Sequence, residues 1–572
     1  MDNKHYAQTL NDVAALLQIK GENRFRVRAF ENAAQTIDRL GESVEQRLDA
    51  ETVEELSGIG SSIAEDLRQI QQTGTCEIRT RLIDEMDAGL LEMLDIQGLG
   101  PKRIKKIYEE LELTTIDGLL AAAEDGEIQT ISGFGAKTEQ NIVDEIERLA
   151  QKKGRTPLPA ANRVARGLRA KLVEMETVER VEIAGSLRRG RETIGDVDLL
   201  VATDEPDRVI EPFVGYPEVD DVLARGTSKT SVRLMDGLQV DLRFVDREIF
   251  GAALHYFTGS KAHHVQLRSR AKRQGFKISE YGVFRLEDDE RLACRTEEEV
   301  FEALDLDYVA PELREGSGEI ERAAAGDLPE LVDADQIRGD VHMHTTETDG
   351  SATIGGMAEA AKERGLDYIA ITDHSEAVRV ANGMTPDRLE AHIEAIRRAD
   401  REISDFAILT GIEVDILEAG ELDMDHDLLA ECDWVVGSVH SKFGLEEEAM
   451  TDRLLRAIDS GLVSALGHPT GRILGGRDGY SYDFERVVDA AADAGVALEI
   501  NGSEGRIDLN ADLARLARKR GAEIVLGSDA HSTRGLDAIG YAVQQARRAG
   551  LGADDVLNTK DAEAFVAGTL PG

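Results

Sequence analysis

The spacing of apolar residues along the chain changes near residue 150. From Tyr6 to about Ala150 the apolar residues recur at intervals of three and four, which predicts helices and no strand. Short strand-like runs follow at 181–184, 199–202 and 238–245. Seven further runs alternate with helical stretches, the rhythm of a parallel barrel, and they end at His344, His374, Glu413, His440, His468, Asn501 and Asp529. We therefore expect a multidomain chain with a helical part, an α+β part and an α/β barrel.

One short pattern, apolar-x-Gly-apolar-Gly, occurs three times in the helical part and each time opens a helix. The glycines are Gly58 and Gly60, Gly98 and Gly100, Gly133 and Gly135. They permit a tight bend, after which the amides at the helix N-terminus face outward and suit a phosphate oxygen. A single such turn would be an ordinary helix connection. Three in register, two of them followed by Lys102 and Lys137, resemble helix-hairpin-helix motifs, which hold nucleic-acid backbones without reading sequence.

A pair of aspartates lies in the first strand-like part of the chain. Asp196 and Asp198 are two residues apart, so in an extended strand they would point to the same face. Asp241 lies inside the run 238–245, where a carboxylate is costly to bury unless it is paired or binds a metal. An isolated Asp-x-Asp pair is more often a solvated turn. Here the Gly185-Ser186 turn upstream favours metal-assisted phosphoryl transfer instead, with three carboxylates holding two divalent ions.

Histidines concentrate near the C-terminus, where eight of the twelve follow residue 340. Six of the eight, with three carboxylates, stand at or just after the ends of the strand-like runs: His342, His344, Asp349, His374, Glu413, His440, His468, Asp529 and His531. The strand C-termini of a barrel meet at one end. One such histidine would more often be structural, as we expect for His5, His255 and His392. Nine candidate ligands at equivalent positions predict a centre for zinc, manganese or iron.

Composition narrows the class of protein. A length of 572 residues suggests about three or four domains. No apolar stretch reaches transmembrane length and the polar N-terminus lacks a secretory pattern, so we expect a cytoplasmic protein with no membrane partner. The three cysteines are far apart, which argues against a disulfide framework or a zinc knuckle.

The net charge of −44 would ordinarily argue against a polyanionic partner. Local reversals change this picture: residues 152–191 carry eleven Lys or Arg against four Glu, and residues 261–279 carry six Lys or Arg and no acidic residue. Such basic islands indicate a track for phosphates. The large acidic excess, few aromatics and more Arg than Lys resemble proteins of salt-accumulating organisms, so we expect a halophilic protein.

The motifs together resemble a known family. Gly185-Ser186, Gly195, Asp196-x-Asp198 and Asp241 resemble the palm signature of the nucleotidyltransferase superfamily, and the string Tyr256-Phe257-Thr258-Gly259-Ser260 narrows the resemblance to the family X DNA polymerases. The resemblance implies a palm with a mixed sheet, in which Asp196, Asp198 and Asp241 are catalytic and bind two Mg²⁺ ions. It implies nucleotide contacts from Gly185, Ser186, Arg189, Gly195, Tyr256, Phe257 and Gly259. It also places Arg268 near the template or primer end, and the hairpin glycines and lysines on the DNA backbone.

Two positions depart from the family pattern. Asp66 stands where the eukaryotic repair enzyme of this family has its Schiff-base lysine, and Ser62 does not supply the neighbouring basic residue. Deoxyribose-phosphate lyase activity by that route is therefore not expected. His264 stands where the family commonly has an asparagine against the base edge.

The histidine-rich part resembles the PHP (polymerase and histidinol phosphatase) domain, a distorted (β/α)7 barrel with a centre for up to three Mn²⁺ or Zn²⁺ ions. The resemblance implies that one ion is held by His342, His344, Glu413 and Asp529, a second by Glu413, His440 and His468, and a third by Asp349, His374 and His531. Bacterial and archaeal family X polymerases carry this domain at the C-terminus. There it acts as a 3′–5′ exonuclease and often as an AP endonuclease or 3′ phosphatase.

The resemblance covers nearly the whole chain and implies a domain order. We expect an N-terminal DNA-binding domain at 1–95, a fingers-like hairpin region at 96–151, the palm at 152–247, the thumb at 248–315, a linker at 316–338 and the PHP domain at 339–572. The predicted function is gap filling in DNA repair of the base-excision type, acting on DNA and dNTPs; no protein partner is indicated. The alternatives are a template-independent nucleotidyltransferase and a DNA-end-binding repair scaffold with weak catalysis.

Overall fold

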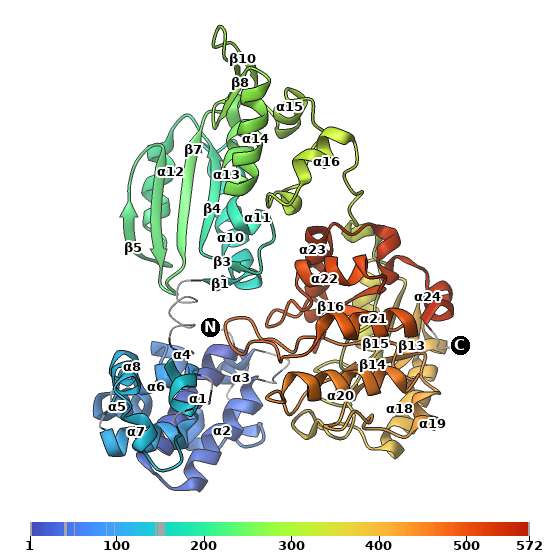
Figure 1. Cartoon of the computed structure of the whole chain (residues 1–572). Coiled ribbons are helices and arrows are strands. Elements are labelled where there is room, and N and C mark those ends of the chain that lie inside the picture. Colours follow the sequence, from blue (N-terminus) through green and yellow to red (C-terminus); the bar gives the residue numbers. More distant parts are fainter. Residues whose placement is uncertain are drawn as a thin grey trace. The chain divides into compact units, whose positions relative to one another are not determined.

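The computed structural model divides into two compact units, residues 1–153 and 154–572 (Figure 1). It describes residues 3–569 apart from 39, 41–42, 51, 87–88, 97, 112, 136, 144–145 and 147–154. The predicted domain boundary at 151/152 thus lies outside the described residues. Within the described ranges, no helix is long and apolar enough to cross a membrane.

The N-terminal unit is helical where it is described, as the periodicity predicts. Its helices, including short 3₁₀ turns, are α1 (Asn3–Lys20), α2 (Arg24–Asp38), α3 (Val44–Asp49), η1 (Val53–Glu55), α4 (Ser61–Thr73), α5 (Glu77–Met86), α6 (Gly89–Glu92), η2 (Met93–Asp95), α7 (Pro101–Leu111), α8 (Ile116–Glu124) and η3 (Ile128–Thr130), followed by a helical segment at 137–143. Each predicted hairpin turn buries its central apolar residue, Ile59, Leu99 or Phe134, in one hydrophobic cluster. Burial of these side chains fixes the turns on the surface of the unit.

A five-stranded mixed sheet opens the second unit. Its order is β2 (Arg180–Ile183), β4 (Asp196–Ala202), β7 (Gln239–Val245), β6 (Lys229–Leu234) and β5 (Val219–Ala224). β4 and β7 are parallel and the other neighbours antiparallel. Helices α10 (Leu158–Val173) and α12 (Pro206–Val214) supply apolar residues to the same core cluster. The short strands β1 (Thr156–Pro157) and β3 (Thr193–Ile194) pair with each other, and the short helix α11 (Gly185–Arg188) contacts β4.

The chain continues into a region of helices and a small antiparallel sheet. Its elements are η4 (Arg247–Ile249), α13 (Phe250–Thr258), α14 (Lys261–Arg273), β8 (Phe276–Ser279), β9 (Gly282–Arg285), β10 (Arg291–Ala293), α15 (Glu297–Glu302), η5 (Pro311–Leu313) and α16 (Glu319–Ala325). The predicted linker 316–338 is only partly a connector. Ile320 and Ala323 of α16 are buried in the core of this region, so α16 packs as part of it.

Seven parallel strands form the C-terminal barrel, in sequence order. They are β11 (Gly339–Asp340), β12 (Tyr368–Ile371), β13 (Ala407–Asp415), β14 (Trp434–Ser438), β15 (Ala465–Leu466), β16 (Ala497–Asn501) and β17 (Ile524–Gly527). A parallel bridge between Met343 and Ala530 links the two ends of the sheet. The predicted (β/α)7 fold is therefore confirmed.

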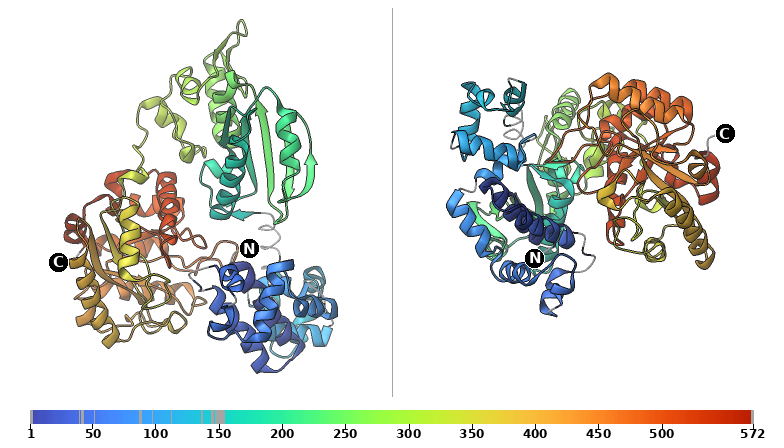
Figure 2. Two further views of the ribbon diagram at one scale, coloured as in Figure 1. Left: turned by 180° about the vertical axis from the view of Figure 1, so that it is seen from behind. Right: turned by 90° about the horizontal axis from the view of Figure 1, so that it is seen from below.

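Helices surround these strands, as Figure 2 shows for the orange and red parts of the chain. They are α17 (Ile354–Glu363), α18 (Pro386–Glu402), α19 (His426–Leu429), α20 (Glu447–Asp459), α21 (Phe484–Ala494), α22 (Ala511–Lys519), α23 (Ile539–Ala549) and α24 (Ala562–Thr569), with short 3₁₀ turns η6 (Ala334–Gln336), η7 (Arg379–Ala381), η8 (Gly535–Ala538), η9 (Ala553–Asp555) and η10 (Leu557–Thr559). Such a shell is expected because both faces of a parallel sheet are normally covered.

The mixed sheet and the barrel share part of their packing. Ile507, in the loop after β16, is fully buried and belongs to the hydrophobic cluster of the mixed sheet. Ion pairs Arg163–Glu504 (2.5 Å) and Arg472–Glu192 (2.9 Å) connect the same two regions.

Candidate active sites and nucleic-acid interface

Strand register brings the three predicted aspartates together. In the parallel pair β4–β7, Asp198 is directly opposite Asp241, and Asp196 lies two residues before Asp198 on the same face. One carboxylate oxygen from each lies within 4.8 Å of the others. Oxygen ligands of this kind suit Mg²⁺.

The three aspartates have only a few basic neighbours, which act unequally on their carboxyl groups. Burial raises the pKa of Asp198 to about 6, and repulsion from Asp196 adds to this, whereas Arg243 opposes it. Burial would also raise the pKa of Asp241, but hydrogen bonds from Lys229, Ser231 and Gln239 hold it below its ordinary value. The Lys229 ammonium lies 2.6 Å from Asp241. The cluster therefore holds more negative charge than its neighbours neutralise, which favours a cation.

Gly185 packs directly against this cluster. Its φ is +63°, and a Cβ at this position would lie 2.4 Å from Oδ2 of Asp198. The adjacent Ala184 amide donates to the Asp198 carbonyl at 2.8 Å. Ser186 follows at the start of α11, and Gly195 stands immediately before Asp196. The Gly-Ser turn and the Asp-x-Asp pair are thus in direct contact.

The Tyr256–Phe257 pair lies at the end of α13, close to the aspartates. The Arg243 guanidinium carbon lies 4.3 Å from the centre of the Phe257 ring, and its Nε is 3.4 Å from Asp198. Tyr256 and Phe257 are half-buried and packed edge to face, with ring centroids 5.2 Å apart. The His264 ring donates a hydrogen bond to the Tyr256 carbonyl at 2.9 Å. Arg268 is exposed on α14.

Arg188 and Arg189, which follow the Gly185-Ser186 turn, both have protein partners. Arg188 pairs with Glu297 at 2.5 Å. Arg189, predicted to contact nucleotide phosphates, donates to the Thr258 carbonyl at 2.5 Å and lies 3.2 Å from Glu315. Gly259 makes room for it, because a Cβ there would lie 2.9 Å from Arg189 Nη1. The predicted phosphate-binding arginine is therefore held by the Thr258 carbonyl and the Glu315 carboxylate.

The nine predicted ligands of the barrel converge at the C-terminal end of its strands. They form three overlapping groups: His344, Asp349, His374 and His531; His342, His344 and Asp529; His374, Glu413 and His440. His468 lies 2.9 Å from Glu413 Oε1. Relative to the sets implied by resemblance, His344 also reaches the Asp349 group and His374 also reaches Glu413. Glu413 is central to the arrangement.

The polar atoms of this centre suit a cation. Buried atoms without a hydrogen-bond partner include Nε2 of His342, Nε2 of His344, Oδ1 of Asp349 and Oε2 of Glu413. Burial opposes ionisation of Glu413, but the surrounding His440, His374 and His342 hold its pKa well below its ordinary value. Leaving so many buried donors and acceptors unpaired is costly. Imidazole nitrogens and carboxylate oxygens at these spacings can hold divalent metals.

Supporting residues of the centre were not predicted from the sequence. Glu499 accepts from Nδ1 of His342 at 2.7 Å and from the amide of His468 at 2.6 Å. Such a contact fixes the tautomer of the imidazole and leaves its other nitrogen free to bind a metal. The only signal was that Glu499 lies on a strand-like run two residues before Asn501. Arg506, 3.5 Å from Asp529, adds a guanidinium at the rim.

The three hairpin turns have equivalent backbone geometry. Their first glycines have positive φ, namely Gly58 (+81°), Gly98 (+91°) and Gly133 (+94°). A Cβ on the second glycines, Gly60, Gly100 and Gly135, would meet nothing within 4 Å. Internal packing thus does not require the second glycine, whereas close approach of an external backbone would. Lys102 and Lys137 are exposed beside two of the turns.

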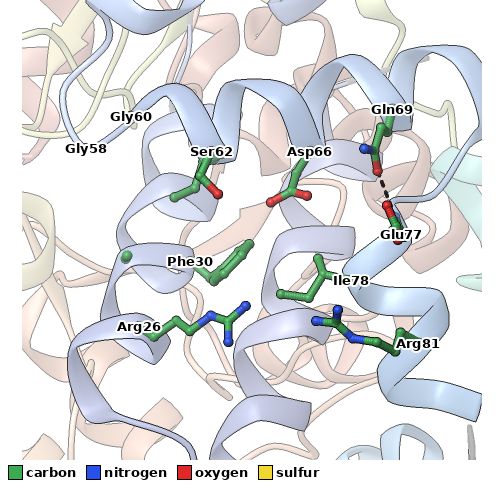
Figure 3. A pocket seen from close by; sticks show the side chains of 12 residues that line it. Arg26, Phe30, Gly58, Gly60, Ser62, Asp66, Gln69, Glu77, Ile78 and Arg81 are labelled. Carbon is green, nitrogen blue, oxygen red and sulfur yellow. Dashed lines mark hydrogen bonds between the residues drawn. The ribbon is translucent and has the colours of Figure 1, made fainter. Parts of the chain in front are cut away.

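A pocket of about 480 Å³ adjoins the first hairpin turn (Figure 3). Asp66 and Ser62 line one side, Phe30 and Ile78 lie between, and Arg26 reaches in from the other side. Burial raises the pKa of Asp66 to about 6, although Arg26 opposes this. No lysine is among the described residues that line it.

Comparisons with known proteins cover the same regions. Models of a helix-hairpin-helix domain (residues 1–76), a SAM-like helix-hairpin-helix tandem (90–148), the DNA polymerase beta thumb (253–315) and the PHP domain (340–503) match the chain. A probable phosphatase of Vibrio atlanticus is 33% identical over 36% of this chain and 83% of its own, and one of Shewanella amazonensis is 34% identical over 34% and 77%.

The similarity to a third protein extends over the entire length. The DNA polymerase/3′-5′ exonuclease PolX of Bacillus subtilis is 37% identical over 571 residues, 99% of both chains. This similarity spans the hairpin unit, the mixed sheet with its three aspartates, and the histidine-rich barrel. The chain belongs to the family X DNA polymerases with a C-terminal PHP domain, the PolX family.

Proposed function

We propose that this protein fills short gaps in DNA during repair of the base-excision type and trims 3′ ends in a second, hydrolytic site. The observation that supports this most strongly is the presence, in one chain, of two separate clusters of metal-competent side chains on different folds. The relative from Bacillus subtilis, similar over its whole length, is named as a DNA polymerase and 3′-5′ exonuclease.

In the synthetic site, Asp196, Asp198 and Asp241 would hold two Mg²⁺ ions. Such ions activate a primer hydroxyl and neutralise charge on the triphosphate. Ser186 and the backbone around it would bind phosphate oxygens, and Arg189 would add a guanidinium. Tyr256 and Phe257 would pack against the sugar, where Gly259 allows close approach. We propose the hairpin turns, Lys102, Lys137 and Arg268 as contacts to the DNA.

In the barrel, the nine ligands would hold up to three Mn²⁺ or Zn²⁺ ions, which supply an activated water and stabilise charge on a phosphoester. Glu499 would orient His342 and His468. Exonuclease action on 3′ ends is the proposed main activity, with AP endonuclease and 3′ phosphatase as further activities of the same centre. We infer that the substrates are gapped or primed DNA and dNTPs, in the cytoplasm.

Separate loss of the two activities tests the proposal. Asp198→Ala should abolish nucleotide incorporation on a gapped, labelled substrate and leave 3′–5′ hydrolysis intact. His342→Ala should do the reverse. Loss of both activities in either folded variant would contradict two independent sites. Incorporation on single-stranded primers without a template would favour a template-independent transferase, and DNA binding without turnover in Mg²⁺ or Mn²⁺ would favour a scaffold.

A further inference from the structure

One carboxylate, Glu315, connects the nucleotide-binding turn of the palm to the barrel. Its Oε1 lies 3.2 Å from Nε of Arg189 and 3.1 Å from Nη1 of Arg548, which belongs to α23 of the PHP domain. Arg191 is farther, at 3.9 Å, and half exposed. Glu315 therefore has two close guanidinium partners, one from each catalytic half of the chain.

Helix α23 also holds the backbone of the same turn. Arg548 Nη1 donates to the Arg189 carbonyl at 2.5 Å, and the fully buried Gln545 donates to the Gly190 carbonyl at 3.0 Å. The side chains of Arg189 and Arg548 are 12% and 9% exposed, so little water is available to replace either partner of Glu315. Carboxylates in such surroundings are costly to leave unpaired.

We infer that Arg548 of the PHP domain is a positioning residue for nucleotide binding in the palm, acting through Glu315. The inference rests on the proposed role of Arg189 as a ligand of the triphosphate. Binding of the Arg189 guanidinium to phosphate would compete with its contact to Glu315. Arg548 keeps Glu315 paired when this happens, so the release of Arg189 does not strand a partly buried carboxylate.

Charge counting supports this arrangement. Three guanidiniums, from Arg189, Arg191 and Arg548, lie within 3.9 Å of the single Glu315 carboxylate before any nucleotide is bound. A triphosphate would accept one of these cations without leaving Glu315 bare. Without Arg548, the exposed Arg191 would be the remaining partner, and Glu315 would retain Arg189 more strongly.

The test measures incorporation of a single dNTP into a gapped substrate by the full-length protein. Arg548→Gln should raise the KM for dNTP roughly ten-fold, the scale expected for one charged hydrogen bond, with little change in kcat or in 3′–5′ exonuclease activity. Arg548→Lys should restore much of the affinity. Arg547→Gln is the matched control, because the neighbouring Arg547 pairs with Glu312 at 2.7 Å rather than with Glu315, and its KM should stay as in the wild type.

Combining Arg548→Gln with Glu315→Gln tests whether Arg548 acts through the Glu315 carboxylate or only by holding the backbone of the turn at Arg189. In Glu315→Gln, KM should equal or fall below the wild-type value, and the added Arg548→Gln should then have no effect. A KM that rises equally with and without Glu315 would overturn the inference, because Arg548 would then act only on the backbone. Arg189→Gln tests the proposed role of Arg189 separately. If the KM for dNTP is unchanged in Arg189→Gln, both that role and this inference are refuted. If the KM rises in Arg189→Gln but stays at the wild-type value in Arg548→Gln, only the inference is refuted.

Discussion

Replacement of Gly185 by alanine should lower the polymerase rate roughly a hundred-fold, because it displaces one catalytic carboxylate. The added Cβ would lie 2.4 Å from Oδ2 of Asp198, whereas ordinary contact begins near 3.4 Å, so one group must move by about 1 Å. Misplacement on that scale costs roughly a hundred-fold in rate. The left-handed backbone at φ +63° adds strain of about 1–2 kcal/mol.

Gly237 provides a matched control for this substitution. It has a similar φ of +85° and lies in the turn between β6 and β7, where an added Cβ would meet nothing within 4 Å. Gly237→Ala should therefore lose about 1–2 kcal/mol of stability and keep its activity. Single-nucleotide incorporation and urea unfolding of both variants compare the two effects. If Gly185→Ala retains the turnover of Gly237→Ala, the contact with Asp198 does not control catalysis.

Three further outcomes follow from the geometry. Glu499→Gln should weaken metal binding by the barrel about 10–100-fold, measured by metal titration, with polymerase turnover unchanged; equal affinity would remove Glu499 from the centre. Burial raises the pKa of Asp66 to about 6, so its ionisation opposes folding and the free energy of unfolding should fall as the pH rises from 4 towards 7. In urea unfolding, Asp66→Asn should remove on the order of 1 kcal/mol of that decline. The same pH profile in the variant and the wild type would contradict this explanation. The excess of acidic residues predicts a requirement for salt: stability and incorporation should improve with KCl up to molar concentration, and best performance in dilute buffer would refute the halophilic hypothesis.

Much of the fold could be predicted from the periodicity of apolar residues in the sequence. The parallel pairing of β4 with β7 places Asp198 opposite Asp241. Asp241 lies inside the strand-like run 238–245, and Asp198 immediately precedes the apolar run 199–202. The nine histidine and carboxylate positions of the barrel were predictable for a similar reason, since strand ends in a parallel barrel meet at one end. In both sites the backbone pattern alone determines which side chains converge.

Long-range pairing is where sequence reasoning was insufficient. Arg189 and its partner Glu315 are 126 residues apart, and no local pattern signals this pairing. His264 bonds to the Tyr256 carbonyl eight residues earlier in the chain, on the preceding helix. Segment 316–338 reads as a connector because it is rich in glycine, but Ile320 and Ala323 give α16 an apolar face that packs. These outcomes depend on tertiary neighbours rather than on local propensity.

The burial of Ile507 among the side chains of the mixed sheet has a consequence for how the protein could be divided. The related phosphatases match about a third of this chain. Here a loop of the barrel completes the hydrophobic core of its neighbour, with Tyr541 and Leu474 packed beside it. Excising either half would leave an apolar face on one fragment and a void in the other. The mixed sheet and the barrel are therefore expected to unfold in one cooperative transition, so that polymerase and exonuclease activities are lost at the same temperature. The two fragments produced by a cut between residues 326 and 338 should remain associated.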